Sequence, residues 1–99
     1  MAEQCKDDQV RCHARFQGRV QGVGFRMTTC SCAKPYWPDV TGWVRNEPDG
    51  SVSMVAEGPR GKLESLLADL QSRMQRNIHD AAVHWSEPSG EFTGFETRY

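Results

Sequence analysis

Hydrophobic residues recur at a helical spacing in the second half of the chain. Positions i, i+3, i+4, i+7 and i+11 of this segment are occupied by Leu63, Leu66, Leu67, Leu70 and Met74. This spacing gathers the side chains on one face of a helix. The helix is predicted to begin at Gly58-Pro59. Proline is favoured at the start of a helix, because the N–H that it lacks would have no helical partner there. The pattern predicts an amphipathic helix that covers a core.

Other segments alternate apolar and polar residues, which is the period of a strand with one covered face. In the first segment the apolar positions are Val10, Cys12, Ala14 and Phe16. Strands are predicted over residues 10–17, 40–46, 51–57 and 81–86, with a last extended piece over 92–99. The Pro48-Asp49-Gly50 turn joins the second and third strands as a hairpin, because proline fixes φ and glycine tolerates the left-handed region.

A further helix is predicted from Phe25 to about Lys34, ended by Pro35 and Pro38. Its inward residues are predicted to be Phe25, Thr29, Cys32 and Ala33. The element order is therefore β-α-β-β-α-β with a terminal strand. The compact solution for this order is an α+β sandwich of the split β-α-β kind, an antiparallel sheet with two helices on one face.

This topology places two segments of the chain at one sheet edge. The right-handed first crossover leaves strands 10–17 and 40–46 pointing the same way, with strand 51–57 between them. The glycine-rich stretch after the first strand and Asn46 at the end of the second then lie about 10 Å apart, two strand spacings. A phosphate can bridge that gap.

The stretch Gly-Arg-Val-Gln-Gly-Val-Gly-Phe-Arg at residues 18–26, here called the glycine loop, has the composition of an anion site. Its glycines let successive backbone N–H groups converge on one point. The helix beginning near Phe25 directs its unpaired N–H groups there, and Arg26 adds charged donors. A tight strand-to-helix turn would show the same glycines. No Lys-Ser or Lys-Thr pair follows, and the spacing differs from the dinucleotide pattern, so the expected ligand is a single phosphate or carboxylate.

Asn46 has two interpretations. An Asn beside a turn often hydrogen-bonds its own backbone. Opposite the glycine loop, its amide could instead direct a water at a phosphorus atom held by Arg26. Residues 18–26 contain no Ser, Thr, Cys, Asp or His to act as a nucleophile. An amide cannot act as a general base, so for an enzyme the leaving group must be good without help, as a carboxylate is. This chemistry points to mixed anhydrides of carboxylic acid and phosphate.

Length and charge set the remaining expectations. The chain has 99 residues and a net charge of −1, which suits one domain without a broad basic face for nucleic acid or anionic lipid. Residues 1–8 are polar and predicted to be a flexible tail, and residues 9–99 to be a single domain. The N-terminus has no apolar stretch of the kind that directs secretion, and no segment approaches a membrane span. We expect a cytoplasmic monomer.

Cys5, Cys12, Cys30 and Cys32 are too few and too irregularly spaced for a secreted disulfide framework or a zinc knuckle. They are expected to be reduced thiols, Cys12 and Cys32 as small core residues. Cys30 follows Arg26 by one helical turn, where a cation and a helix start favour the thiolate, so it could serve as a redox handle.

Two long motifs resemble the acylphosphatase family. They are the glycine loop and Gly-Trp-Val-Arg-Asn-x-Pro-Asp-Gly-Ser-Val from Gly42, followed by Ala-Glu-Gly-Pro from Ala56. The resemblance covers about Val10 to Tyr99. It implies a ferredoxin-like α+β sandwich and hydrolysis of acyl phosphates such as acetyl phosphate, carbamoyl phosphate or 1,3-bisphosphoglycerate, without metal or other cofactor. Inorganic phosphate would be product and competitive ligand.

The resemblance also implies roles for individual residues. Arg26 would bind the phosphate and Asn46 would position the water, as the two catalytic residues. The backbone amides of the phosphate site would come from Gln21, Gly22, Val23, Gly24 and Phe25, together with Arg26. The chain departs from the family pattern over Met27 to Val40, where Thr, Ser and Cys replace an Ala-rich helix and a longer proline-containing segment follows. Cys30 and Cys32 have no family counterpart, and this helix is expected to be short.

The alternative function is a non-catalytic module of the same fold that binds RNA or another anion through the glycine loop. RNA binding would favour exposed aromatic residues on the central strands, which the first strand lacks. The remaining candidate side chains are scattered, and they are expected to be solvated or to pack rather than to bind a ligand. They are His13, His79, His84, Trp37, Trp43 and Trp85.

Overall fold

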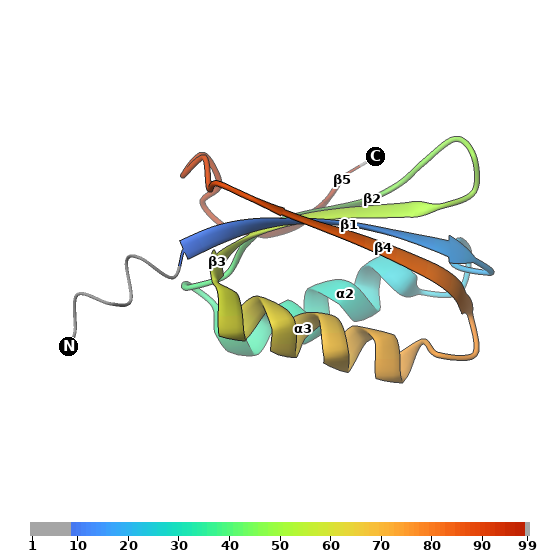
Figure 1. Ribbon diagram of the computed structural model, residues 1–99. Helices are drawn as coiled ribbons and strands as arrows, with labels where there is room; N and C mark the ends of the chain where they lie inside the picture. Colours follow the sequence, from blue (N-terminus) through green and yellow to red (C-terminus); the bar gives the residue numbers. More distant parts are fainter. Residues whose placement is uncertain (1–8, 99) are drawn as a thin grey trace.

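The computed structural model describes residues 9–98. The predicted flexible tail, Cys5 and Tyr99 lie outside the described residues. The elements in chain order are β1 (Gln9–Gly18), α2 (Phe25–Ala33), the 3-10 turn η1 (Lys34–Tyr36), β2 (Thr41–Asn46), β3 (Val52–Pro59), α3 (Arg60–Arg73), β4 (Ile78–Ser86) and β5 (Phe95–Arg98). Both helices cover the same face of one sheet (Figure 1). The predicted α+β sandwich is confirmed.

The sheet has the strand order β4-β1-β3-β2-β5. Strands β1, β2, β3 and β4 pair antiparallel, as predicted, and β3 lies between β1 and β2. The terminal strand β5 adds a fifth member, which pairs parallel with β2. The sheet is therefore mixed rather than purely antiparallel, and β5 becomes the neighbour of the strand that carries Asn46.

The core lies between the sheet and the two helices. The helical spacing of leucines correctly identified the buried face of α3, where Leu63, Leu66 and Leu70 are fully buried. The alternation in β1 is likewise confirmed by its buried Cys12, Ala14 and Phe16. All four residues predicted to face inward from α2 are buried. Helix α2 is short, as expected, and ends before the proline-containing segment.

The connection from β4 to β5 is held by one buried carboxylate. Glu57 on β3 accepts hydrogen bonds from the Ser89 N–H (2.8 Å), the Ser89 hydroxyl (2.9 Å) and the Gly90 N–H (2.9 Å). Arg11 Nε lies 2.9 Å from the same carboxylate as an ion pair. At the end of the connection, the Gly42 N–H donates to the Gly94 carbonyl at 2.8 Å, which starts the pairing of β5 with β2.

Neither helix in the described part of the chain is both long enough and apolar enough to cross a membrane.

Candidate functional site

The glycine loop leads from β1 into α2 through two left-handed glycines. Gly22 and Gly24 have φ of 75° and 78°, and Gly24 is the N-cap of α2. A Cβ atom at either position would meet nothing within 4 Å, so the requirement is the backbone conformation rather than space. Because glycine adopts positive φ without steric cost, these residues turn the loop back over the N-terminus of the helix.

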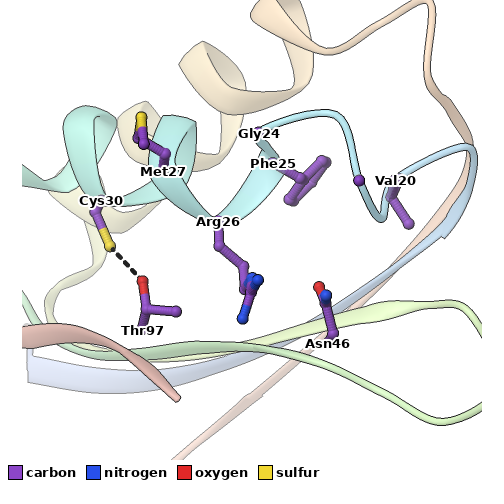
Figure 2. Close-up of a pocket in the computed structure, with 9 residues that line it drawn as sticks. Val20, Gly24, Phe25, Arg26, Met27, Cys30, Asn46 and Thr97 are labelled. Atoms are coloured by element: carbon purple, nitrogen blue, oxygen red, sulfur yellow. Dashed lines mark hydrogen bonds between the residues drawn. The ribbon is translucent and has the colours of Figure 1, made fainter. Parts of the chain in front are cut away.

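A pocket of about 350 Å³ lies between this loop and the sheet, lined in part by Gly22, Gly24 and Phe25. Arg26, in the first turn of α2, and Asn46, the last residue of β2, also line it. Figure 2 shows the Arg26 side chain reaching down from the helix while Asn46 points up from the strand. The two predicted catalytic side chains therefore share one cavity, although they lie on separate elements.

Two residues predicted to contribute backbone amides are absent from the lining. Val23 has a side chain that is 38% exposed. The Gln21 side chain is directed to the β2–β3 turn, where Nε2 donates to the Glu47 carbonyl at 2.7 Å and to the Ser51 carbonyl at 2.9 Å. Gln21 thus ties the glycine loop to the turn that follows Asn46.

The carboxylates nearest to Asn46 in the chain, Glu47 and Asp49, already accept hydrogen bonds from other side chains. Asp49 accepts from the Ser51 hydroxyl (2.6 Å), the Ser51 N–H (3.0 Å) and Arg15 (2.7 Å). These donors lower the pKa of Asp49 to about 2. A hydrogen bond from the Ser53 hydroxyl, with help from Arg45, also lowers the pKa of Glu47. Neither carboxylate lines the pocket, which agrees with a site that lacks a general base next to Asn46.

The far wall of the pocket was not predicted as part of the site. It consists of Met27 and Cys30 from α2 and Thr97 from β5. Cys30 Sγ lies 3.5 Å from Thr97 Oγ1, across the gap between helix and strand. The spacing of Cys30 from Arg26 placed it on the same helix face, but no sequence signal indicated Thr97, because the partner of β5 was unknown.

The other candidate residues lie outside this pocket. His13 and His84 are exposed and sit opposite each other on β1 and β4. Trp37 is 62% exposed and does not pack in the core. Cys12 and Cys32 are buried, as predicted. Among residues 9–98, no three His, Cys, Asp or Glu side chains form a group that could hold a metal ion.

The fold and the pocket together define a ferredoxin-like sandwich with a cavity formed by a glycine loop, an arginine and an amide. The chain belongs to the acylphosphatase family, whose model matches residues 12–97. The predicted family is thereby confirmed, and the match spans both sequence motifs.

Individual relatives agree with this assignment. An acylphosphatase from Salinibacter ruber is 47% identical over 89 residues, covering 89% of this chain and 92% of the relative. One from Nocardia farcinica is 45% identical and covers 92% of this chain and 90% of the relative. The crystal structure of acylphosphatase from Bacillus subtilis superimposes with a TM-score of 0.79 at 29% identity, covering 91% of this chain and 99% of the other.

Proposed function

We propose that this protein hydrolyses acyl phosphates to a carboxylate and inorganic phosphate. The observation that carries the proposal is the meeting of Arg26, Asn46 and the glycine loop in one pocket. Family membership supports the same reaction, since the relatives are named acylphosphatases.

The phosphate group binds to backbone N–H groups of residues 21–26, of which Gly22, Gly24, Phe25 and Arg26 line the pocket, and to the Arg26 guanidinium. These donors lie at the N-terminal, positive end of α2. Together with the helix dipole they stabilise the negative charge that develops on the phosphoryl oxygens. Asn46 holds a water in line with the phosphorus–oxygen bond of the anhydride. The water oxygen bonds to phosphorus, the bond to the acyl oxygen breaks, and its electron pair leaves with the carboxylate. The water proton passes to solvent.

The reaction proceeds without a strong base because the leaving group is stable as an anion. A carboxylic acid has a pKa of about 4, far below that of an alcohol, so its carboxylate departs without being protonated. Glu47 and Asp49 accept hydrogen bonds from other residues, which lower their pKa values, so neither carboxylate is suited to act as a base. The reaction uses no metal or organic cofactor, and inorganic phosphate competes with substrate for the same donors.

The protein acts as a cytoplasmic monomer on a small-molecule substrate, without nucleic acid or membrane as a partner. Gel filtration with light scattering tests the monomeric state.

The decisive experiment is acetyl phosphate hydrolysis by the wild type, Arg26→Ala and Asn46→Ala. We expect each substitution to lower kcat/KM by at least about 10²-fold, the usual loss when one group that stabilises or positions the transition state is removed. Arg60→Ala is the matched control, because this exposed arginine lies at the start of α3, outside the pocket. A chelator should leave the rate unchanged.

Circular dichroism should show all three variants folded. Wild-type turnover in Arg26→Ala or Asn46→Ala would reject the assigned roles. A wild type that binds phosphate without hydrolysing any acyl phosphate would instead favour the non-catalytic anion-binding module.

A further inference from the structure

A second cavity adjoins the far wall of the phosphate pocket. It has a volume of about 410 Å³ and is lined by Cys30, Ala33, Lys34, Trp37, Gly94 and Phe95. Cys30 lines both cavities. The two hollows therefore lie next to each other along α2, one on each side of Cys30 and both beside β5, and together they are called the groove.

The groove is long and mainly apolar. From Arg26 to Lys34 the helical rise gives about 12 Å, two turns of helix. Of the large hydrophobic side chains that are exposed in the described part of the chain, Met27 (76% exposed) lines the first cavity and Trp37 (62% exposed) lines the second. Exposed apolar side chains that gather at one hollow, rather than being scattered, mark binding surfaces.

The geometry of the proposed reaction points the acyl group toward this groove. In-line attack requires the leaving group to lie opposite the attacking water. Figure 2 shows Asn46 on one side of Arg26 and Cys30 with Thr97 on the other. A phosphate held by Arg26, with its water at Asn46, therefore has its acyl oxygen on the side of Cys30.

We infer that the groove from Met27 past Cys30 to Trp37 and Phe95 binds the acyl group, and that the protein prefers acyl phosphates with an extended apolar acyl chain over acetyl phosphate. This inference rests on the proposed hydrolysis. The Lys34 stem can add apolar contact along the groove while its ammonium group stays in water. The helix side of the groove, from Met27 to Trp37, lies in the segment in which the chain departs from the family pattern.

The test compares hexanoyl phosphate with acetyl phosphate as substrates of the wild type. Burying even two of the added methylene groups favours hexanoyl phosphate by roughly tenfold in kcat/KM. Trp37→Ala should lower the hexanoyl-to-acetyl ratio by about threefold or more, because one wall of the groove is lost. Trp37→Phe should restore most of the ratio. The inhibition constant of inorganic phosphate should be the same in all variants, since phosphate binds beside Arg26, in the first cavity, and Trp37 lines only the second.

Trp43→Ala is the matched control. It removes the same side chain from the sheet face that the helices leave uncovered, where Trp43 contacts Arg45 and Arg98, and it should keep the wild-type ratio. Equal kcat/KM for the two substrates, or an unchanged ratio in Trp37→Ala, would overturn the acyl groove while leaving the hydrolase proposal intact. No hydrolysis of either substrate would overturn both.

Discussion

Gln21 shows how a single side chain connects two parts of the site. Its amide nitrogen donates to two backbone carbonyls of the β2–β3 turn. Those bonds join the glycine loop, which would hold the phosphate, to the turn beside Asn46, which would hold the water. The distance between phosphate and water would therefore be set partly by the Gln21 side chain, which hydrogen-bonds the turn and not the phosphate.

Replacing Gln21 with Ala should loosen this connection. The Glu47 and Ser51 carbonyls lose their shared donor, which costs about 1–3 kcal/mol when the acceptors are shielded from water. We expect kcat for acetyl phosphate to fall about tenfold, with a smaller rise in KM, because in-line alignment suffers more than phosphate binding. Steady-state kinetics together with the melting temperature measure both effects. Wild-type kcat in a variant with a lowered melting temperature would show that the connection serves stability alone.

At this scale, the sequence indicated where residues of a chemically determined type lie, while their roles in catalysis stay predictions. Arg26 could be predicted as a pocket residue, because a helix N-terminus preceded by glycines attracts an anion and an arginine in the first turn adds charged donors there. The structure places Arg26 in the pocket. The side-chain role of Gln21 could not be predicted, because its acceptors are backbone carbonyls, which every residue offers. Trp37 could not be placed either, since a tryptophan beside prolines is compatible with burial and with exposure.

At the scale of elements, the position of β5 depends on hydrogen bonds made by the connection that precedes it rather than by β5 itself. Glu57 on β3 holds the connection that brings β5 beside β2. Burial alone would raise the pKa of Glu57, but the Ser89 and Gly90 N–H groups, the Ser89 hydroxyl and Arg11 together lower it. The carboxylate is thus ionised at neutral pH and fixes the path into β5, the strand that supplies Thr97 to the pocket.

Glu57→Gln should destabilise the protein in a pH-dependent manner. Because the folded pKa lies below the ordinary value of 4.5, the stabilisation by the carboxylate is present above pH 4.5 and is lost as the pH falls through the folded pKa. At pH 7 we expect a loss of about 2–4 kcal/mol in the free energy of unfolding, since the buried donors lose a charged acceptor. The gap between variant and wild type should narrow toward pH 3.

Urea unfolding at both pH values measures this gap. Glu64→Gln is the matched control, because Glu64 pairs with Arg60 on the exposed surface of α3 and such pairs contribute little. A gap for Glu57→Gln that stays constant with pH would contradict the assigned role of the charge.

The placement of β3 between β1 and β2 followed from the sequence, because the crossover rule leaves few choices. The pairing of β5 did not follow. Its four residues carry too weak an alternation to indicate a partner, and the contact that directs it lies on Glu57, far away in the chain.

At the scale of the whole molecule, buried thiols limit stability in alkaline solution. Burial raises the pKa of Cys12 to about 11. Burial, with the nearby Asp69 carboxylate, does the same for Cys32. In the unfolded chain both thiols return to the ordinary value of 9.0, so between pH 9 and 11 the unfolded state loses protons that the folded state keeps. The contribution of the two protonated thiols to the free energy of unfolding is therefore fully present below pH 9 and decreases as the pH rises to 11.

The expected decrease is about 2 kcal/mol for each thiol at pH 11. The double variant Cys12→Ala and Cys32→Ala should start from a lower stability at pH 8, because small cavities remain in the core. Its further loss between pH 8 and pH 10.5 should be smaller than that of the wild type. Chemical denaturation at these two pH values checks the prediction, and parallel losses in both proteins would refute it.

The contact between Cys30 and Thr97 joins residues that are 67 positions apart in the chain. A pocket wall made in this way has no local precursor: the glycine loop, Arg26 and Asn46 belong to other elements, and the wall opposite them is complete only when the final strand docks. Substrate hydrolysis therefore reports complete folding. In a refolding experiment that follows both the helical circular dichroism signal and the enzymatic rate, the enzymatic rate should recover after the helical signal.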